Sequence, residues 1–121
     1  METKLNLQDI GEFSYIENHL KPILGEVSKD SSFGSDCSLV SLEINHSNLV
    51  SSADVGPRPI SWKLIGGEDD YLTYGYYSVL VNASDLATEG ATPVGYLNST
   101  EAPAQMKISH LDDFFSGVKE A

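Results

Sequence analysis

The sequence has few basic residues, and this shortage limits its possible partners. Seven lysines and arginines stand against 18 aspartates and glutamates, which gives a formal net charge of −11. Such a chain repels phosphate backbones, so a nucleic-acid partner is not expected. A polyphosphate ligand would need divalent cations to neutralise an acidic site. The simpler alternative is that the acidic residues form a solvated surface.

Cysteine and long apolar runs are also scarce. Cys37 is the single cysteine, which excludes an intrachain disulfide and a cysteine-rich metal site. No apolar run approaches the roughly 20 residues of a membrane span. The first nine residues lack the basic and then apolar pattern of a secretory signal. We therefore expect a cytoplasmic protein with no membrane partner.

The 121 residues fit one domain, residues 1–121, with the composition of an ordinary globular protein. Apolar spacing predicts three helices, at Glu12–Leu24, from Asp69 or Asp70 to Glu89, and at Ser109–Lys119. Pro22 is expected to bend or end the first helix, and Ser109 to cap the last. The middle helix is apolar on nearly every face, which predicts burial inside the domain or against a partner.

Three segments have the pattern of strands: Cys37–Ile44, Leu49–Val55 and Thr92–Ser99. The turn-type residues between the first two favour a hairpin. The predicted order is helix, strand, strand, helix, strand, helix. Strands interleaved with helices in this way indicate an α+β or α/β domain.

Several common functional motifs are absent. The sequence contains no GxxxxGK[ST] or GxGxxG loop for nucleotide phosphates, no HExxH and no GxSxG. The three histidines lie far apart without the spacing of metal ligands. The pattern therefore gives no support to a zinc site or to a marked nucleophile.

Three aspartates have more informative positions. Asp36 closes a loop before a strand, Asp54 follows an apolar strand, and Asp85 lies within the apolar middle helix, three residues after Asn82. A carboxylate in an apolar helix is costly unless it is paired, hydrogen-bonded or bound to a cation. If the three converge, they make an oxygen-ligand site for Mg²⁺. Alternatively, Asp36 caps a turn, Asp54 ends a strand, and Asp85 pairs with a lysine or backbone amides.

Four segments, in order, resemble the thiamine-monophosphate kinases of the aminoimidazole-ribonucleotide-synthase superfamily. Gly11–Ile16 looks like that family's GEF-x-x-I opening, and Gly34–Leu39 looks like its GDD loop. Leu49–Asp54 is similar to its strand ending in STD, and Asn82–Pro93 to NLSDLAAMGADP. Together the four segments span most of residues 11–93, so the ordered set is more specific than any one match.

The resemblance implies a fold and a set of roles. It implies an α/β sandwich with a mixed or antiparallel sheet of about four strands, completed into a barrel when two copies form a homodimer. It implies phosphoryl transfer from ATP, with Mg²⁺ ions holding the phosphates. The implied metal ligands are Asp36, Ser52, Ala53 (through its backbone oxygen), Asp54 and Asp85. The implied nucleotide contacts include Gly34 and Asn82.

This sequence also departs from the family pattern. Ser35 replaces the first loop aspartate, and Ala53 replaces the middle residue of STD. The family's substrate-contacting histidine segment has no counterpart. Arg58 stands in this region and can meet a phosphate or carboxylate of another substrate, or simply face solvent. The phosphoryl acceptor is therefore not identified.

The family's GGDT motif and C-terminal domain have no counterpart before Ala121. We expect a domain fragment or shortened homologue that is inactive by itself. Two alternatives remain open. One is a non-catalytic dimerisation module. The other is a relative with another substrate, of the aminoimidazole-ribonucleotide-synthase, hydrogenase-maturation or selenophosphate type.

Overall fold

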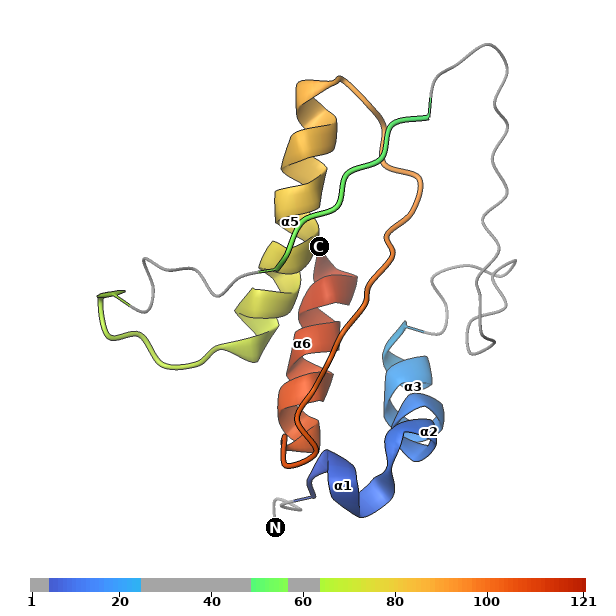
Figure 1. Ribbon diagram of the computed structural model, residues 1–121, viewed down its shortest axis with the longest axis vertical. Helices are drawn as coiled ribbons and strands as arrows, with labels where there is room; N and C mark the ends of the chain where they lie inside the picture. The colour runs from blue at the N-terminus through green and yellow to red at the C-terminus, as the bar shows by residue number, and fades with distance from the viewer. Residues whose placement is uncertain (1–4, 25–48, 57–63) are drawn as a thin grey trace.

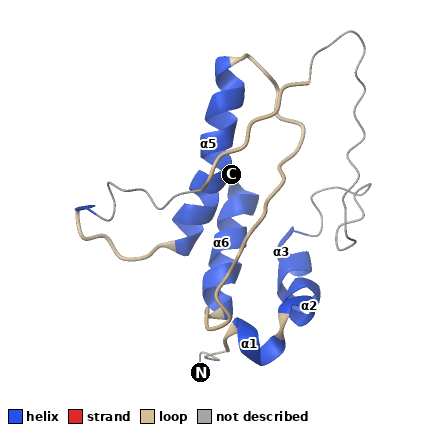
Figure 2. Cartoon of the chain, in the orientation of Figure 1, coloured by secondary structure: helices blue, strands red, loops and turns tan. Residues whose placement is uncertain are grey.

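The computed structural model describes residues 5–24, 49–56 and 64–121, and this part of the chain is mainly helical (Figures 1 and 2). Near the N-terminus, four short helical segments follow one another: α1 (Leu7–Ile10), α2 (Glu12–Tyr15), η1 (Ile16–Leu20) and α3 (Lys21–Leu24). Two longer helices follow, α5 (Tyr71–Thr88) and α6 (Ile108–Glu120). α5 and α6 lie side by side and run in the same direction, joined by the long segment 89–107 (Figure 1).

The predicted helix over Glu12–Leu24 is confirmed, but it passes through Pro22 without ending there. The segment just before the proline, η1, is a π-helix, in which the Lys21 N–H donates to the Ile16 carbonyl five residues earlier. Proline has no N–H for the usual carbonyl four residues back. One wider π turn directly before the proline is a known way for a helix to absorb such a disruption.

The middle helix, α5, has the boundaries that its sequence predicts. Asp70 is its N-cap, and the Asp70 carboxylate accepts from the Thr73 N–H at 3.0 Å and from the Thr73 hydroxyl at 2.6 Å. These hydrogen bonds lower the pKa of Asp70, because they stabilise its charged form. At the other end Gly90 has φ +64°, a left-handed conformation that glycine adopts most easily.

The last helix begins one residue earlier than predicted. Lys107, rather than Ser109, is its N-cap, and no side chain caps it. The Ile108 side chain is 4% exposed, and the Ile108 N–H donates to the Leu5 carbonyl. Burial of Ile108 and this contact with the N-terminal segment therefore fix the start of α6. The Ser109 cap prediction was wrong.

α5 and α6 touch through their backbones. A methyl group added at Gly75 would overlap the Phe114 carbonyl, and one added at Gly117 would overlap the Leu72 carbonyl. Both glycines are buried, and no side chain separates the two helices at this crossing. The close approach therefore depends on glycine at both positions.

The core lies on the opposite side of α6, where the N-terminal segments pack (Figure 1). Four residues form its buried cluster: Tyr15, Ile108, Leu111 and Phe115. Backbone hydrogen bonds tie the N-terminal segment to the start of α6, from Leu7 N–H to Met106 O and from Gln8 N–H to Ala104 O. The N-terminal helices thus cover the face of α6 that α5 leaves open.

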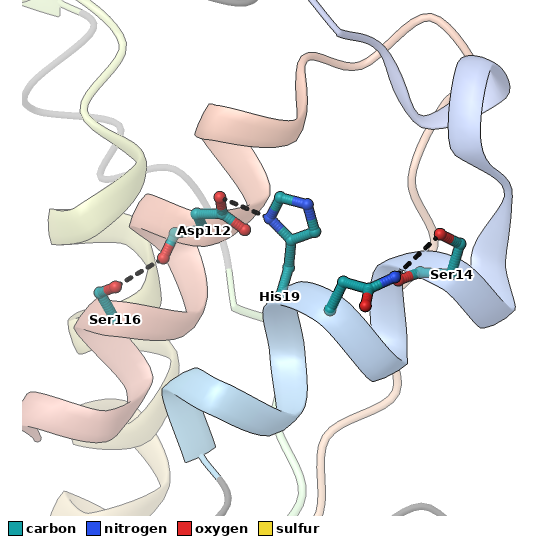
Figure 3. A network of polar contacts seen from close by, with 5 residues as sticks. Ser14, His19, Asp112 and Ser116 are labelled. Carbon is teal, nitrogen blue, oxygen red and sulfur yellow. Dashed lines mark hydrogen bonds and ion pairs between the residues drawn. The ribbon is translucent and has the colours of Figure 1, made fainter.

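A polar contact also joins the N-terminal helices to α6 (Figure 3). His19, on the π-helix, lies 3.1 Å from the Asp112 carboxylate on α6, measured from Nδ1 to Oδ2. The His19 ring also stacks on Tyr15, with centroids 5.3 Å apart. Within the described part of the chain, the buried Tyr15 hydroxyl and the buried Asp112 Oδ1 have no hydrogen-bond partner. The contact therefore places polar atoms in the core that are not fully satisfied.

The predicted sheet-based α+β sandwich, with a barrel formed by dimerisation, was wrong for the residues described. These residues are 57% helical, 2% lie in an isolated bridge, and they contain no sheet. Leu49–Val55 and Thr92–Ser99 run as irregular chain, whereas Cys37–Ile44 lies outside the described residues. Strand formation requires the N–H and C=O groups of a neighbouring strand. The two irregular segments instead meet α5, whose backbone groups are already paired within the helix.

α5 is also less buried than its apolar composition suggests. Gly75 and Ser78 are its two buried residues, and four of its large side chains are between 37% and 43% exposed: Leu72, Tyr76, Tyr77 and Leu80. Burial of α5 inside the domain was therefore the wrong alternative, and its burial against a partner stays a prediction. In the described part of the chain, no helix combines the length and the apolar character needed to cross a membrane.

Replacing either glycine at the helix crossing should destabilise the protein. We expect Gly75→Ala and Gly117→Ala each to cost about 2 kcal/mol or more, because the added methyl group forces the helices apart. This loss exceeds the roughly 1 kcal/mol that alanine gains in helix propensity. Urea unfolding followed by circular dichroism measures the effect. Ser84→Ala, at an exposed position of α5, is the matched control. Wild-type stability in both glycine variants would contradict the close contact.

Removing the Tyr15 hydroxyl should have a small effect on stability. The hydroxyl is buried beside the Asp112 carboxylate without a well-formed hydrogen bond, so Tyr15→Phe should change the free energy of unfolding by no more than about 1 kcal/mol. Urea unfolding at pH 7 tests this, with the exposed Tyr77→Phe as the control. A large loss of stability in Tyr15→Phe would show that the hydroxyl has a partner.

The same residue should give the protein a sensitivity to alkali. Burial raises the pKa of Tyr15, and the nearby Asp112 carboxylate raises it further. The folded state therefore holds this proton more tightly than the unfolded state, whose pKa is about 10. The resulting contribution to stability is present below about pH 10 and is lost as the pH rises above it. Tyr15→Phe should lose less stability than the wild type between about pH 9.5 and 11.

Candidate functional site

Two of the predicted site residues meet on the C-terminal half of α5. The Ser52 hydroxyl donates to Asp85 Oδ2 at 2.7 Å, although the residues are 33 positions apart. This half of α5 extends past the end of α6, and segment 49–56 crosses it (Figure 1). The structure therefore brings together the strand-end serine and the helix aspartate that the sequence singled out.

The other predicted residues have different surroundings. Asp54 Oδ1 accepts from the N–H of the next residue, Val55, at 2.7 Å. Asn82 donates from its side chain to the Ser78 carbonyl of its own helix at 3.0 Å. Ala53 is exposed. Gly34, Asp36 and Arg58 lie outside the described residues, so their predicted roles stay predictions.

The C-terminal end of segment 49–56 also packs against α5. Gly56 approaches α5 so closely that an added Cβ would lie 2.9 Å from the Ser78 Cβ. Ser78 is 5% exposed, and its hydroxyl donates to the Gly75 carbonyl at 2.7 Å. The Tyr96 hydroxyl donates to the Ser78 oxygen at 3.1 Å. Ser78 thus joins α5 to two irregular segments.

Sequence reasoning missed Ser78 and Tyr96 as anchoring residues. The available signal was a serine in the most apolar stretch of α5, because a buried hydroxyl needs a hydrogen-bond partner. Its partner, Tyr96, is 18 residues away on an irregular segment. Local pattern does not reveal such a distant partner.

The carboxylates of this region have no ion-pair partner among the described residues. Among the described residues, neither Asp54 nor Asp85 forms an ion pair, and no group of three histidine, cysteine or acidic residues is close enough to hold a metal. The lysine pairing considered for Asp85 is replaced by the Ser52 hydroxyl. Convergence of three aspartates depends on Asp36 and stays a prediction.

The oxygen atoms at this position suit a hard cation. Mg²⁺ binds oxygen ligands at about 2.0–2.1 Å in octahedral geometry, which sets neighbouring ligands about 2.9 Å apart. The Ser52 Oγ and Asp85 Oδ2 atoms lie 2.7 Å apart, so a small adjustment would give them the spacing of adjacent ligands. The two oxygen atoms are therefore of the type and spacing that Mg²⁺ takes, and the magnesium site itself stays a prediction.

Comparison with known proteins identifies the family. The model for the AIR synthase related protein, N-terminal domain, matches residues 34–121, and the chain therefore belongs to this family. The match includes Ser52, Asp54 and Asp85, whereas the helices between residues 5 and 24 precede it. No curated protein and no solved structure matches the chain significantly.

Removing the Ser52 hydroxyl should release segment 49–56 from α5. We expect Ser52→Ala to cost about 0.5–1.5 kcal/mol, the usual net value of a hydrogen bond, because the pair is exposed and the Asp85 carboxylate stays solvated in the variant. Amide hydrogen exchange in residues 50–56 should become faster. Ser51→Ala, at the neighbouring exposed serine, is the control and should have little effect. Equal effects in the two variants would contradict a specific Ser52–Asp85 contact.

Proposed function

We propose that this chain is the Mg-ATP-binding N-terminal domain of an ATP-dependent small-molecule phosphotransferase of the thiamine-monophosphate kinase type. The observation that carries the proposal is the Ser52–Asp85 hydrogen bond within a chain of the AIR synthase related family. The two residues come from separate motifs that resemble the magnesium-binding motifs of these kinases. Their contact supports a shared ligand site.

In this proposal Asp85 provides the main charged ligand, and the Ser52 hydroxyl provides a second oxygen ligand beside it. Asp54 and the backbone oxygen of Ala53 contribute further oxygen atoms from the same segment. Asp36 supplies another carboxylate, with Gly34 in the same loop and with Asn82 and Arg58 as further contacts to the nucleotide. Bound Mg²⁺ would neutralise the phosphates and orient the terminal phosphoryl group for transfer.

The electrostatics favour this use of magnesium. With a net charge of −11, the chain by itself repels a nucleotide polyphosphate. Cations held by the aspartates reverse the local charge, so nucleotide affinity should depend on Mg²⁺. The phosphoryl acceptor is a small molecule whose contacts include the region around Arg58.

A second candidate function is that of an assembly module without catalysis. The exposed apolar side chains of Leu72, Tyr76 and Leu80 lie at helical spacing along one face of α5. This face supports a homodimer, with either function. Ser35 and Ala53, where the kinase motifs have other residues, favour the candidate without catalysis.

Titration of Mg-ATP into this chain tests the proposal. We expect saturable binding that disappears with EDTA and a higher melting temperature in the presence of Mg-ATP. At a ligand concentration 100 times Kd, the stabilisation should be about 2.7 kcal/mol. Asp85→Asn should abolish the shift, because it removes the charged ligand. Asp113→Asn, an exposed carboxylate on α6, should leave it unchanged.

Sedimentation and nucleotide titration of the same sample together separate the two candidates. A dimer that binds no nucleotide would support the assembly module. A melting shift that survives in both Asp54→Asn and Asp85→Asn would count against the kinase proposal.

A further inference from the structure

A second feature is a pocket of about 190 Å³. It lies between the first turns of α5, the first turns of α6, the segment 100–106 and Gly56 at the end of segment 49–56. Three aromatic side chains line it, those of Tyr71, Tyr74 and Phe114. Glu101 also lines the pocket and is exposed, and it is the one acidic residue among the described lining residues.

The walls of this pocket are held by several independent contacts. The α5–α6 crossing at Gly75 and Gly117 fixes the spacing of the two helices. Tyr71 is stacked on His110 of α6, with ring centroids 4.3 Å apart and planes within 13°. The two aromatic residues of α5 contact each other edge to face at 5.8 Å.

A series of hydrogen bonds holds the third wall of the pocket, which is segment 100–106. The Thr100 hydroxyl donates to the Asn98 side-chain oxygen, and the Asn98 amide donates to the Tyr96 hydroxyl at 3.1 Å. The Tyr96 hydroxyl in turn donates to the buried Ser78 at 3.1 Å. These hydrogen bonds link Thr100, the residue before Glu101, to α5.

The chemistry of the lining favours a positive ligand. Aromatic rings attract cations to their faces, and the attraction is stronger where water is partly excluded. The Tyr74 hydroxyl donates to Asp69 Oδ1 at 3.2 Å, which makes its ring more electron-rich. Among the described residues that line the pocket there is no lysine, arginine or histidine. The net charge of −11 adds a field that repels anions.

We propose that this pocket binds a small organic cation with a single ring, with the ring among the aromatic side chains and the charged group at Glu101. An apolar cavity of about 150 Å³ is large enough for benzene. A volume of 190 Å³ therefore suits one ring with a short ammonium-bearing substituent.

The pocket and the Ser52–Asp85 contact lie on different halves of α5. Tyr74 and Asp85 are 11 residues apart, which corresponds to about 16 Å along the helix axis. Gly56, at the end of the segment that carries Ser52 and Asp54, also lines the pocket, so the two places share one segment. The inference does not rest on the proposed function, because probes titrated in EDTA and without ATP test it separately.

Three probes of the same size separate charge from shape: benzylammonium, benzyl alcohol and benzoate. Each would be titrated into the ¹⁵N-labelled chain while the amide signals of Tyr71, Glu101 and Phe114 are followed by NMR. We expect saturable shifts with benzylammonium, weaker binding of benzyl alcohol and no binding of benzoate. The shifts should persist in EDTA, since no metal is involved.

Glu101→Gln tests the charged group without disturbing the fold, because the side chain is exposed. We expect about a threefold to fivefold loss of benzylammonium affinity, in the range of an exposed ion pair, with benzyl alcohol unchanged. Glu120→Gln, at the exposed end of α6, is the matched control and should change neither affinity.

Three outcomes would overturn the proposal. These are equal affinity for benzylammonium and benzoate, shifts that do not saturate or that spread over the whole surface, and a Glu101→Gln variant that binds the cation as tightly as the wild type.

Discussion

The direct backbone contact between α5 and α6 is the constraint on which most of the described structure depends. Gly75 and Gly117 allow the two helices to touch without intervening side chains. Because the helices run in the same direction, a long connection must return from the end of α5 to the start of α6 (Figure 1). That connection carries Tyr96 and Glu101, and it meets the N-terminal segment at the start of α6. The pocket and the position of segment 89–107 thus depend on one helix crossing.

The acidic residues differ in whether they have structural partners, and this difference bears on binding. Asp70 caps a helix, and Asp112 meets His19, so these carboxylates have structural partners. Asp85 accepts a hydrogen bond from a neutral hydroxyl and has no ion pair among the described residues. The proposed magnesium site and the proposed cation pocket both use negative charge, but they lie on different halves of α5. The family match covers both halves, whereas the N-terminal helices that stabilise α6 precede it.

The helices were predictable because their signals are local. Asp70 and Gly90 mark the ends of α5, and the spacing of Leu111 and Phe115 places one face of α6 in the core. The expected strands at 49–55 and 92–99 did not form, because a strand depends on a partner that its own residues do not specify. The prediction that α5 is buried inside the domain failed for a similar reason, because composition shows that a helix is apolar but not what covers it. For the candidate site, the order of the motifs predicted that Ser52 and Asp85 belong to one site. The structure added their direct contact.

The sequence by itself determined the charge, the helices, the family-like motifs and the absence of cysteine chemistry. These are properties of composition and of residues a few positions apart, which short-range backbone and side-chain physics fixes. The tertiary structure alone decided that Ser52 meets Asp85, that Tyr96 reaches Ser78, that His19 meets Asp112, and that aromatic side chains and Glu101 surround one pocket. Each of these joins residues separated by many positions along the chain. Their distances are set by how closely α5 and α6 pack, and that depends on contacts throughout the fold.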